Sequence, residues 1–380
     1  MSTQKDAYQK IAERYGMTDS ELFIKVLKGM ITPEESEILC EIDKPVTFSE
    51  LVENTGTGVD ELKPKLDGMM QKGLFGLMGD KYSMPTHAML LCHRTQNKSD
   101  QVDKLWTEFF FKEWRYTIAE HSHKRRLTGM WSTHRIVPAL QALAASPHIP
   151  KDQILPYENY EEMFKHSKMI LFLPCSCRTQ HRQCDNKMEV CVHVILDDDD
   201  GASEKEFAGI LERWPELKPL TYQEAMDEMY ALEDAGLGHL SLNFPRLEEA
   251  CNWCECCCRV VNPLIHAGLD YDLMDPTKSR YLASVDQDAC SGCQTCMERC
   301  IFGAVEMVKV PGSKKMKASI TEKSCMGCGL CVYTCPEKAI RFDIVRPPEH
   351  IPNITREQVF SWGPPPSPED INKAYEPRSF

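Results

Sequence analysis

The stretch that decides the fold is CSGCQTCMERC at residues 290–300, together with CMGCGLCVYTC at residues 325–335. Both runs have the cysteine spacing C-x-x-C-x-x-C-x-x-x-C, and the second begins 35 residues after the first. The agreement continues beyond the cysteines, since CIFGAVEM at 300–307 aligns with CPEKAIRF at 335–342. The sequence therefore contains an internal duplication, and each half supplies four cysteines.

This spacing is typical of thiolates that hold iron–sulfur clusters. Three cysteines, each separated from the next by two residues, can surround one corner of a cluster. Gly292, Gly327 and Gly329 let the backbone approach the cluster closely. The fourth cysteine of such a run ligates the other cluster, so crossed sets are expected. One set is Cys290, Cys293, Cys296 and Cys335, and the other is Cys325, Cys328, Cys331 and Cys300. Short strands are expected at Ala304–Val308, Ala318–Ile320 and Ala339–Phe342.

Residues 281–345 resemble a two-[4Fe–4S] bacterial-type ferredoxin domain, which implies two [4Fe–4S] clusters on these eight cysteines. Two features depart from the family pattern. Ile301 follows Cys300 where the family usually has proline, and the insert Lys309–Lys317 lengthens the connection between the halves.

The composition of the whole chain agrees with metal binding. Its 380 residues include 19 cysteines, and the formal charge is −13. No apolar run approaches the ~18–20 residues that cross a bilayer, and the first residues do not look like a signal peptide, so a cytoplasmic protein is expected. Disulfides are rare in that compartment, which makes metal ligation the better explanation of so many cysteines. The acidic balance argues against a nucleic-acid surface over the whole chain.

A first upstream group lies in ILFLPCSCRTQHRQCDNKMEVCVHVIL at 170–196, and its cysteines are Cys175, Cys177, Cys184 and Cys191. Arg178, His181 and Arg182 place positive charge among these thiols, as a thiolate-rich site needs. The favoured interpretation is a third iron–sulfur cluster. A zinc knuckle and shared ligation with the next group stay open.

A second upstream group lies in EEACNWCECCCRVVNPL at 248–264, and its cysteines are Cys251, Cys254, Cys256, Cys257 and Cys258. Five thiols in eight residues cannot all bind one ion, because adjacent side chains point in different directions. The last three must serve more than one site or leave one thiol free. The favoured interpretation is a fourth relay cluster; the alternatives are a catalytic cluster, as in disulfide reductases, and zinc or mixed ligation.

The order of these motifs resembles a family of anaerobe-type 4Fe–4S dicluster-domain proteins, over residues 150–345. The resemblance rests on ILPYENYEEMF (154–164), PCSCR (174–178), EVC (189–191), AGLGHL (235–240), CNWCECCC (251–258) and the repeat. It implies an iron–sulfur subunit of a multi-subunit oxidoreductase, with one or two [4Fe–4S] clusters besides the first two. It also implies a flavin- or metal-containing catalytic subunit as partner. From the residues themselves we expect no catalytic residue in this chain, no nucleic-acid partner and no membrane span.

We therefore expect an α+β protein in six parts. They are N-terminal helices (1–31), a winged-helix-like module (32–86), a helical linker region (87–150), a cysteine-rich α/β domain (151–280), the two-cluster domain (281–345) and a proline-rich extended tail (346–380). Capping boxes are expected to start helices at Thr32, Thr47, Thr57 and Thr221. Residues 33–84 carry eleven acidic and five basic residues, which favours packing or docking over DNA binding.

The remaining patterns indicate no further chemistry. An aromatic helix over Val102–Ile118 is expected to be core or interface, and HSHKRR at 121–126 a solvated basic face. Dinucleotide-, ATP- and nucleophile-elbow motifs are absent from the sequence. Three hypotheses follow: an electron-transfer subunit, an enzyme with a catalytic cluster at Cys251–Cys258, and a redox-sensing regulator.

Overall fold

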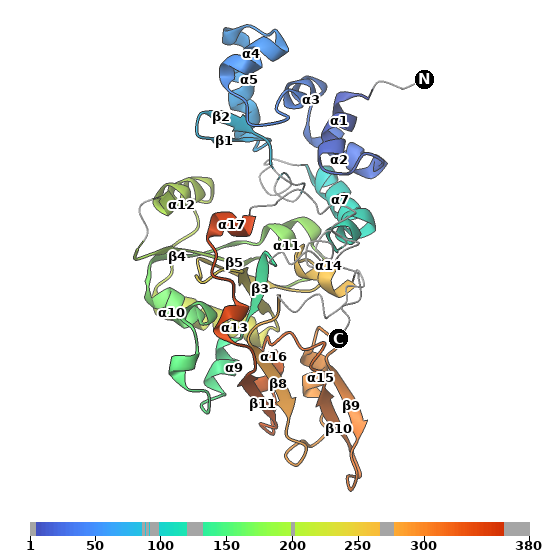
Figure 1. The fold of residues 1–380 in the computed structure, drawn as a ribbon, viewed down its shortest axis with the longest axis vertical. Helices are drawn as coiled ribbons and strands as arrows, with labels where there is room; N and C mark the ends of the chain where they lie inside the picture. The colour runs from blue at the N-terminus through green and yellow to red at the C-terminus, as the bar shows by residue number, and fades with distance from the viewer. Residues whose placement is uncertain are drawn as a thin grey trace, which may run out of the picture. The chain divides into compact units, whose positions relative to one another are not determined.

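The computed structural model describes residues 5–85, 88, 91, 99–119, 132–198, 202–266 and 277–360. The chain divides into two compact units, Met1–Trp114 and Arg115–Phe380 (Figure 1). Within the described ranges, no helix combines the length and the apolar character that crossing a membrane requires. The basic cluster at 121–126, Cys92 and residues 361–380 of the tail lie outside the described residues.

The first unit is mainly helical, with one small hairpin. Its elements are α1 (Ala7–Arg14), α2 (Glu21–Met30), α3 (Pro33–Cys40), α4 (Phe48–Thr55), α5 (Val59–Gln71), β1 (Gly76–Met78), β2 (Lys81–Ser83), α7 (Asp100–Phe109) and the π-helical turn η1 (Phe110–Trp114). A bridge between Val46 and Tyr82 ties the segment before α4 to the hairpin. The order of elements from α3 to β2 is the one expected for a winged-helix-like module, whose assignment stays a prediction.

Local capping explains where most of these helices begin. Thr32 and Thr47 form the expected capping boxes, in which each hydroxyl accepts from the N3 amide and the N3 glutamate accepts from the cap amide. The expectation at Thr57 was wrong. Helix α5 begins after Gly58, which is its N-cap and offers no side-chain bond.

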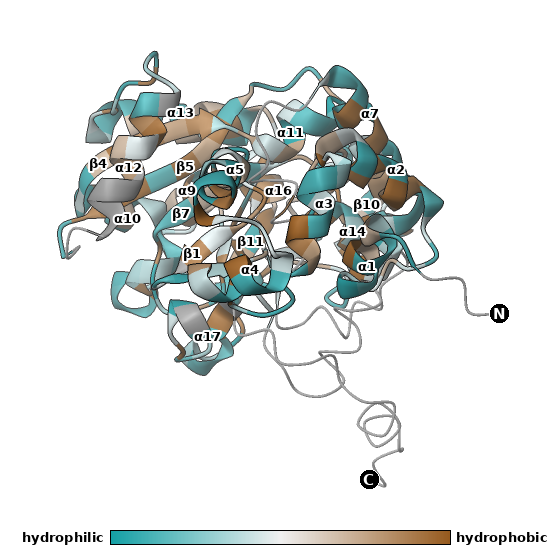
Figure 2. Cartoon of the chain, turned by 90° about the horizontal axis from the view of Figure 1, so that it is seen from above, coloured by the Kyte–Doolittle hydropathy of each residue, from teal (hydrophilic) through white to brown (hydrophobic). Residues whose placement is uncertain are grey.

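Aromatic side chains fill the core of the first unit. Phe23 of α2 stacks on Phe109 of α7 with ring centroids 4.9 Å apart, and Trp106 meets both rings edge-on. All three side chains are buried. In Figure 2 both helices carry polar and apolar residues, as amphipathic helices do. The aromatic helix is thus a core helix, as expected.

The second unit is built on one antiparallel sheet. Its strands are β3 (His134–Val137), β4 (Ser167–Pro174), β5 (Glu189–Leu196), β6 (Gly238–Leu242) and β7 (Glu249–Trp253), in the order β3-β6-β7-β5-β4. Strand β3 comes from the region 87–150, which the sequence pattern indicated as helical. The sheet brings together strands that are distant in the sequence, and this places the cysteines.

Both faces of the sheet are covered. Ile170 and Phe172 of β4 face a core with α10 (Tyr160–Lys165) and α13 (Tyr222–Asp234), while Leu171 and Leu173 pack with Phe207 of α12 (Ala202–Arg213). Side chains alternate between faces along a strand, so a strand covered on both sides has a continuous apolar run. Thr221 caps α13 in the expected capping box.

Shorter elements complete the second unit. They are α9 (Leu140–Ala144), η2 (Lys151–Gln153), η3 (Pro156–Glu158), α11 (Ser176–His181), α14 (Val261–His266), β8 (Tyr281–Val285), α15 (Thr295–Arg299), β9 (Val305–Lys309), β10 (Met316–Ile320), α16 (Leu330–Tyr333), β11 (Ile340–Ile344), η5 (Pro348–His350) and α17 (Arg356–Phe360). The described part of the tail is not fully extended. It contains η5 and α17, and Val359 packs against Leu242 and Phe244.

Candidate metal centres

The duplication seen in the sequence extends to every element of residues 281–344. Strands β8 and β9 and helix α15 begin 35 residues before β10, β11 and α16, respectively. Strand β8 pairs with β11, and β9 pairs with β10, so each two-stranded sheet joins one strand from each half (Figure 1). The two halves are therefore intertwined, and neither could form its sheet alone.

The backbone repeats in the same way. Positive φ angles occur in pairs 35 residues apart: Gly292 and Gly327, Gln294 and Gly329, and Gly303 and Lys338. Glycine is required at two of these positions for a further reason. A Cβ at Gly292 would overlap the Met316 carbonyl oxygen, and one at Gly327 would overlap the Ser279 hydroxyl and the Tyr281 carbonyl. The cysteine loops are thus pressed against neighbouring strands.

Replacing Gly327 with alanine is expected to destabilise this domain more than replacing Gly303. Both positions have positive φ, which costs a residue with a side chain about 1–3 kcal/mol. Only at Gly327 would the added methyl group also overlap other atoms, because nothing lies within 4 Å of a Cβ at Gly303. The measurement is the temperature at which half of the visible absorbance of the clusters is lost when the protein is heated under anaerobic conditions. Equal shifts for the two variants would contradict the overlap.

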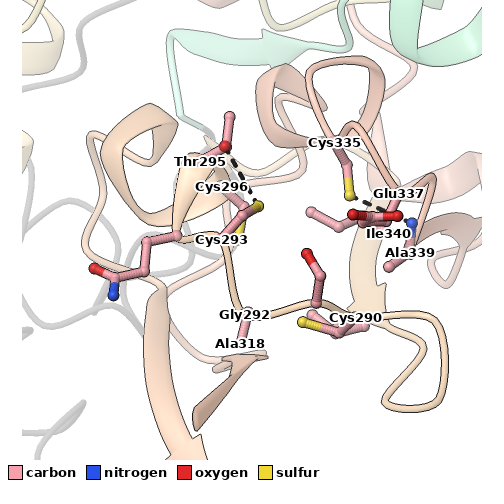
Figure 3. A pocket seen from close by; sticks show the side chains of 13 residues that line it. Cys290, Gly292, Cys293, Thr295, Cys296, Ala318, Cys335, Glu337, Ala339 and Ile340 are labelled. Carbon is pink, nitrogen blue, oxygen red and sulfur yellow. Dashed lines mark hydrogen bonds between the residues drawn. The ribbon is translucent and has the colours of Figure 1, made fainter. Parts of the chain in front are cut away.

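One pocket collects four cysteines from both halves of the duplication. Its lining includes Cys290, Cys293, Cys296 and Cys335, together with apolar side chains such as Val285 and Ile340 (Figure 3). The Ala339 amide donates to the Cys335 sulfur at 3.3 Å, and Thr295 lies 3.4 Å from the Cys293 sulfur. These are the four residues that the crossed pattern assigns to one cluster. Of them, Cys293 is exposed.

The other four cysteines of the duplication, Cys300, Cys325, Cys328 and Cys331, lie close enough for their charges to affect one another's pKa. Burial, and then the charges of Cys300 and Cys325, raise the pKa of the Cys328 thiol to about 12. Burial and the charges of Cys328, Cys325 and Cys300 also raise the pKa of Cys331. The Ala304 amide donates to the Cys300 sulfur at 3.3 Å, which matches the bond at Cys335. Thiolates this buried need a bound cation to offset their charge.

Five cysteines gather at the ends of the central strands, and we call them the five-thiol site: Cys175, Cys177, Cys191, Cys251 and Cys258. Cys175 directly follows β4, while Cys191 of β5 lies opposite Cys251 of β7 in the sheet register. Bonding to Cys177 and burial raise the pKa of Cys175, and bonding to Cys258 and burial raise that of Cys251. Burial raises the pKa of Cys191 to about 12.

The remaining four upstream cysteines form a separate and tighter group, which we call the four-thiol site: Cys184, Cys254, Cys256 and Cys257. All four sulfurs lie within 4.8 Å of one another. Hydrogen bonds from the Cys257 thiol and from Arg178 hold the pKa of Cys254 down, at about 4. This set can bind a metal ion.

The grouping in space differs from the grouping along the chain. The sequence placed Cys184 with Cys175, Cys177 and Cys191, but its sulfur lies 3.7 Å from that of Cys254, which is 70 residues away. Conversely, Cys251 and Cys258 lie with the earlier cysteines. Each group in space therefore takes cysteines from both sequence motifs, and the consecutive Cys257 and Cys258 lie in different groups.

A buried arginine lies beside the four-thiol site. Arg178 donates to the Cys254 sulfur and to the Asn252 carbonyl, both at 3.3 Å, and also to the Lys187 carbonyl. Its side chain is fully buried. Buried guanidinium groups require partners of this kind, and the positive charge offsets that of the thiolates. The sequence predicted positive charge among these thiols, and Arg178 supplies it.

Sequence reasoning missed a buried polar network behind these sites. The Glu233 carboxylate accepts from the Leu140 and Gln141 amides at 2.5 and 3.0 Å, and lies 2.9 Å from Nε2 of His239. Nδ1 of His239 lies 2.6 Å from Asn252 Oδ1, whose amide nitrogen donates to the Val190 carbonyl. The only signal was His239 within AGLGHL, since nothing in the helical pattern around Glu233 marks it as buried.

The comparison with protein families agrees with the geometry of the duplicated region. Residues 283–342 match the family model of the 4Fe–4S dicluster domain. The chain contains a 4Fe–4S dicluster domain. The match covers 60 of the 380 residues, so it describes this domain and not the whole chain. No curated protein and no solved structure shows significant similarity to the chain. The dicluster domain implies iron–sulfur clusters, and the upstream cysteines support additional sites.

Proposed function

We propose that this chain is an electron-transfer subunit that relays electrons through three [4Fe–4S] clusters within a multi-subunit oxidoreductase. Two clusters belong to the dicluster domain, in the crossed sets given above. The third is held by the five-thiol site, where four thiols bind the cluster and the fifth is spare. Iron–sulfur clusters exchange single electrons, and closely spaced clusters pass them on.

The observation that carries this proposal is one apolar cluster that touches two of the sites. Trp253, Phe302 and Met326 are buried in it, with the rings of Trp253 and Phe302 5.5 Å apart. Cys251 and Cys258 of the five-thiol site pack against this cluster, and so do Cys300 and Cys328 of the dicluster domain. A dry apolar contact keeps the two redox centres close and excludes water between them.

The ends of the relay differ in exposure. Cys293 is exposed, so the cluster held with Cys290, Cys296 and Cys335 is the one that an external partner can approach. We propose that the partner is another subunit of the complex, with a flavin- or metal-containing catalytic centre. The alternative of a catalytic cluster at Cys251–Cys258 is less well supported, because Cys254, Cys256 and Cys257 group with Cys184 and apart from Cys251 and Cys258.

The experiment uses the full chain, purified anaerobically, with iron and sulfide analysis and electron paramagnetic resonance after reduction. We expect about 12 irons per chain and three cluster signals. The paired change Cys191→Ala and Cys251→Ala leaves three thiols at the five-thiol site and is expected to remove one signal. Cys40→Ala, a thiol outside all the sites, is the matched control and should retain all three.

The relay would be refuted if the paired variant keeps every iron and every signal of the unmodified chain. Co-purification with a flavin- or metal-containing subunit, reduced or oxidised through these clusters, supports the complex. A solitary chain that retards duplex DNA at physiological salt would instead indicate a redox-sensing regulator.

A further inference from the structure

The sulfur positions at the four-thiol site match a single metal ion. Three of the six Sγ–Sγ distances are 3.7 Å for Cys184–Cys254, 3.8 Å for Cys184–Cys257 and 3.8 Å for Cys256–Cys257, and the other three are no longer than 4.8 Å. A tetrahedral ion with metal–sulfur distances of about 2.3 Å has sulfur–sulfur edges of about 3.8 Å. The three edges of 3.7–3.8 Å therefore equal those of one tetrathiolate ion.

A [4Fe–4S] cluster would need more room. Each of its thiolates binds a different iron, so the four sulfurs stand farther apart than four sulfurs that share one ion. The dicluster domain provides an internal comparison. Across the part of the chain that the structure describes, no second set of three or more cysteine, histidine or acidic side chains comes as close together as the four-thiol site. The eight dicluster thiols are thus spaced more widely.

The surroundings suit a doubly negative centre. Four thiolates around a divalent ion leave a net charge of −2, and Arg178 donates to the Cys254 sulfur at 3.3 Å. The Asn186 amide also faces the Cys184 sulfur, at 3.5 Å. Ligand sulfurs that accept such hydrogen bonds are held in place and are less reactive. Donors reach the site from the loop that carries Cys184 and from α11.

We propose that Cys184, Cys254, Cys256 and Cys257 hold one zinc ion. Tetrahedral four-sulfur sites are occupied by zinc or by iron, and for the same ligands the order of affinities places zinc above iron(II). The ion ties the loop after α11 to the loop after β7. Because zinc is redox-inert, the four-thiol site lies off the electron path. This inference does not depend on the relay.

The test is metal analysis of the full chain, purified anaerobically from medium that contains both iron and zinc. The unmodified protein is expected to hold about one zinc, whose X-ray absorption shows four sulfurs at about 2.3 Å. Cys256→Ala is expected to lose the zinc and keep its iron and sulfide. The paired change Cys191→Ala and Cys251→Ala is expected to lose iron and sulfide and to keep the zinc. Cys40→Ala should change neither the zinc content nor the iron and sulfide content.

Two results would overturn the zinc site. One is an unmodified protein without zinc, or with iron bound by four sulfurs in its place. The other is a folded Cys256→Ala variant that loses iron and sulfide while its zinc content is unchanged. The X-ray absorption of the unmodified protein decides the question even if the variant does not fold. Loss of the third cluster signal in the relay experiment leaves this measurement unaffected, so the two proposals fail separately.

Discussion

A chain in which Cys290 and Cys335 are both replaced by alanine is expected to lose one cluster of the dicluster domain, whereas a chain without Cys290 and Cys300 is expected to lose both. The physical reason is the pairing of strands between the two halves, β8 with β11 and β9 with β10. It carries Cys335 into the pocket of Cys290, Cys293 and Cys296. Cys300 instead lies near Cys328 and Cys331, where burial first and then its charge raise the pKa of both thiols.

The two double variants are matched, because each removes two thiols of the same eight. The measurement is iron and sulfide per chain, with spin quantification after reduction. We expect a loss of about four irons for the first pair and about eight for the second. The opposite ranking would show that each half ligates its own cluster, and would reject the crossed arrangement.

Replacing Glu233 with alanine is expected to lower the free energy of unfolding of the second unit by about 3–5 kcal/mol, because each buried group left without its hydrogen-bond partner costs about 1–3 kcal/mol. The Leu140 and Gln141 amides would lose their acceptor, and His239 would be left beside an apolar methyl group. Both Glu233 and His239 are buried. Both ring nitrogens of His239 lie within hydrogen-bond distance of an oxygen atom, at 2.6 Å from Asn252 Oδ1 and 2.9 Å from Glu233.

The neighbouring Asp234 provides the control. Its carboxylate accepts from Gln141 Nε2 at 2.9 Å in an exposed position, so Asp234→Ala is expected to cost about 1 kcal/mol or less. Urea unfolding of the anaerobic protein, followed by the visible absorbance of the clusters, compares the two. Similar losses for both variants would show that the buried network does not stabilise the unit.

The end of α13 also contacts the dicluster domain, through main-chain carbonyl groups. The Glu233 carbonyl accepts from the Tyr333 hydroxyl at 2.6 Å and from Arg299, which also donates to the Asp234 carbonyl at 2.8 Å. Arg299 precedes Cys300, and Tyr333 lies between Cys331 and Cys335. Cations at the carboxyl end of a helix are stabilised by its dipole. The network therefore connects the central sheet to the cluster loops.

The sequence by itself determined the dicluster domain. Its signal is local: eight cysteines at fixed short spacings, glycines where φ is positive, and a period of 35 residues that predicts paired halves. The capping boxes at Thr32, Thr47 and Thr221 were equally local and were confirmed. At Thr57 the pattern failed because Gly58 already occupies the cap position of α5.

Only the tertiary structure decided how the nine upstream cysteines divide. Strand β7 lies between β6 and β5, which places Cys251 opposite Cys191 and brings the loop after β7 to Cys184. Spacing along the chain describes one loop at a time, but here each site draws on loops about 70 residues apart. Which distant loops meet depends on the strand order and on side-chain burial across the whole sheet, and no short motif encodes that order. The buried pair of Glu233 and His239 has the same origin, because its burial arises from the packing of α13 on the sheet.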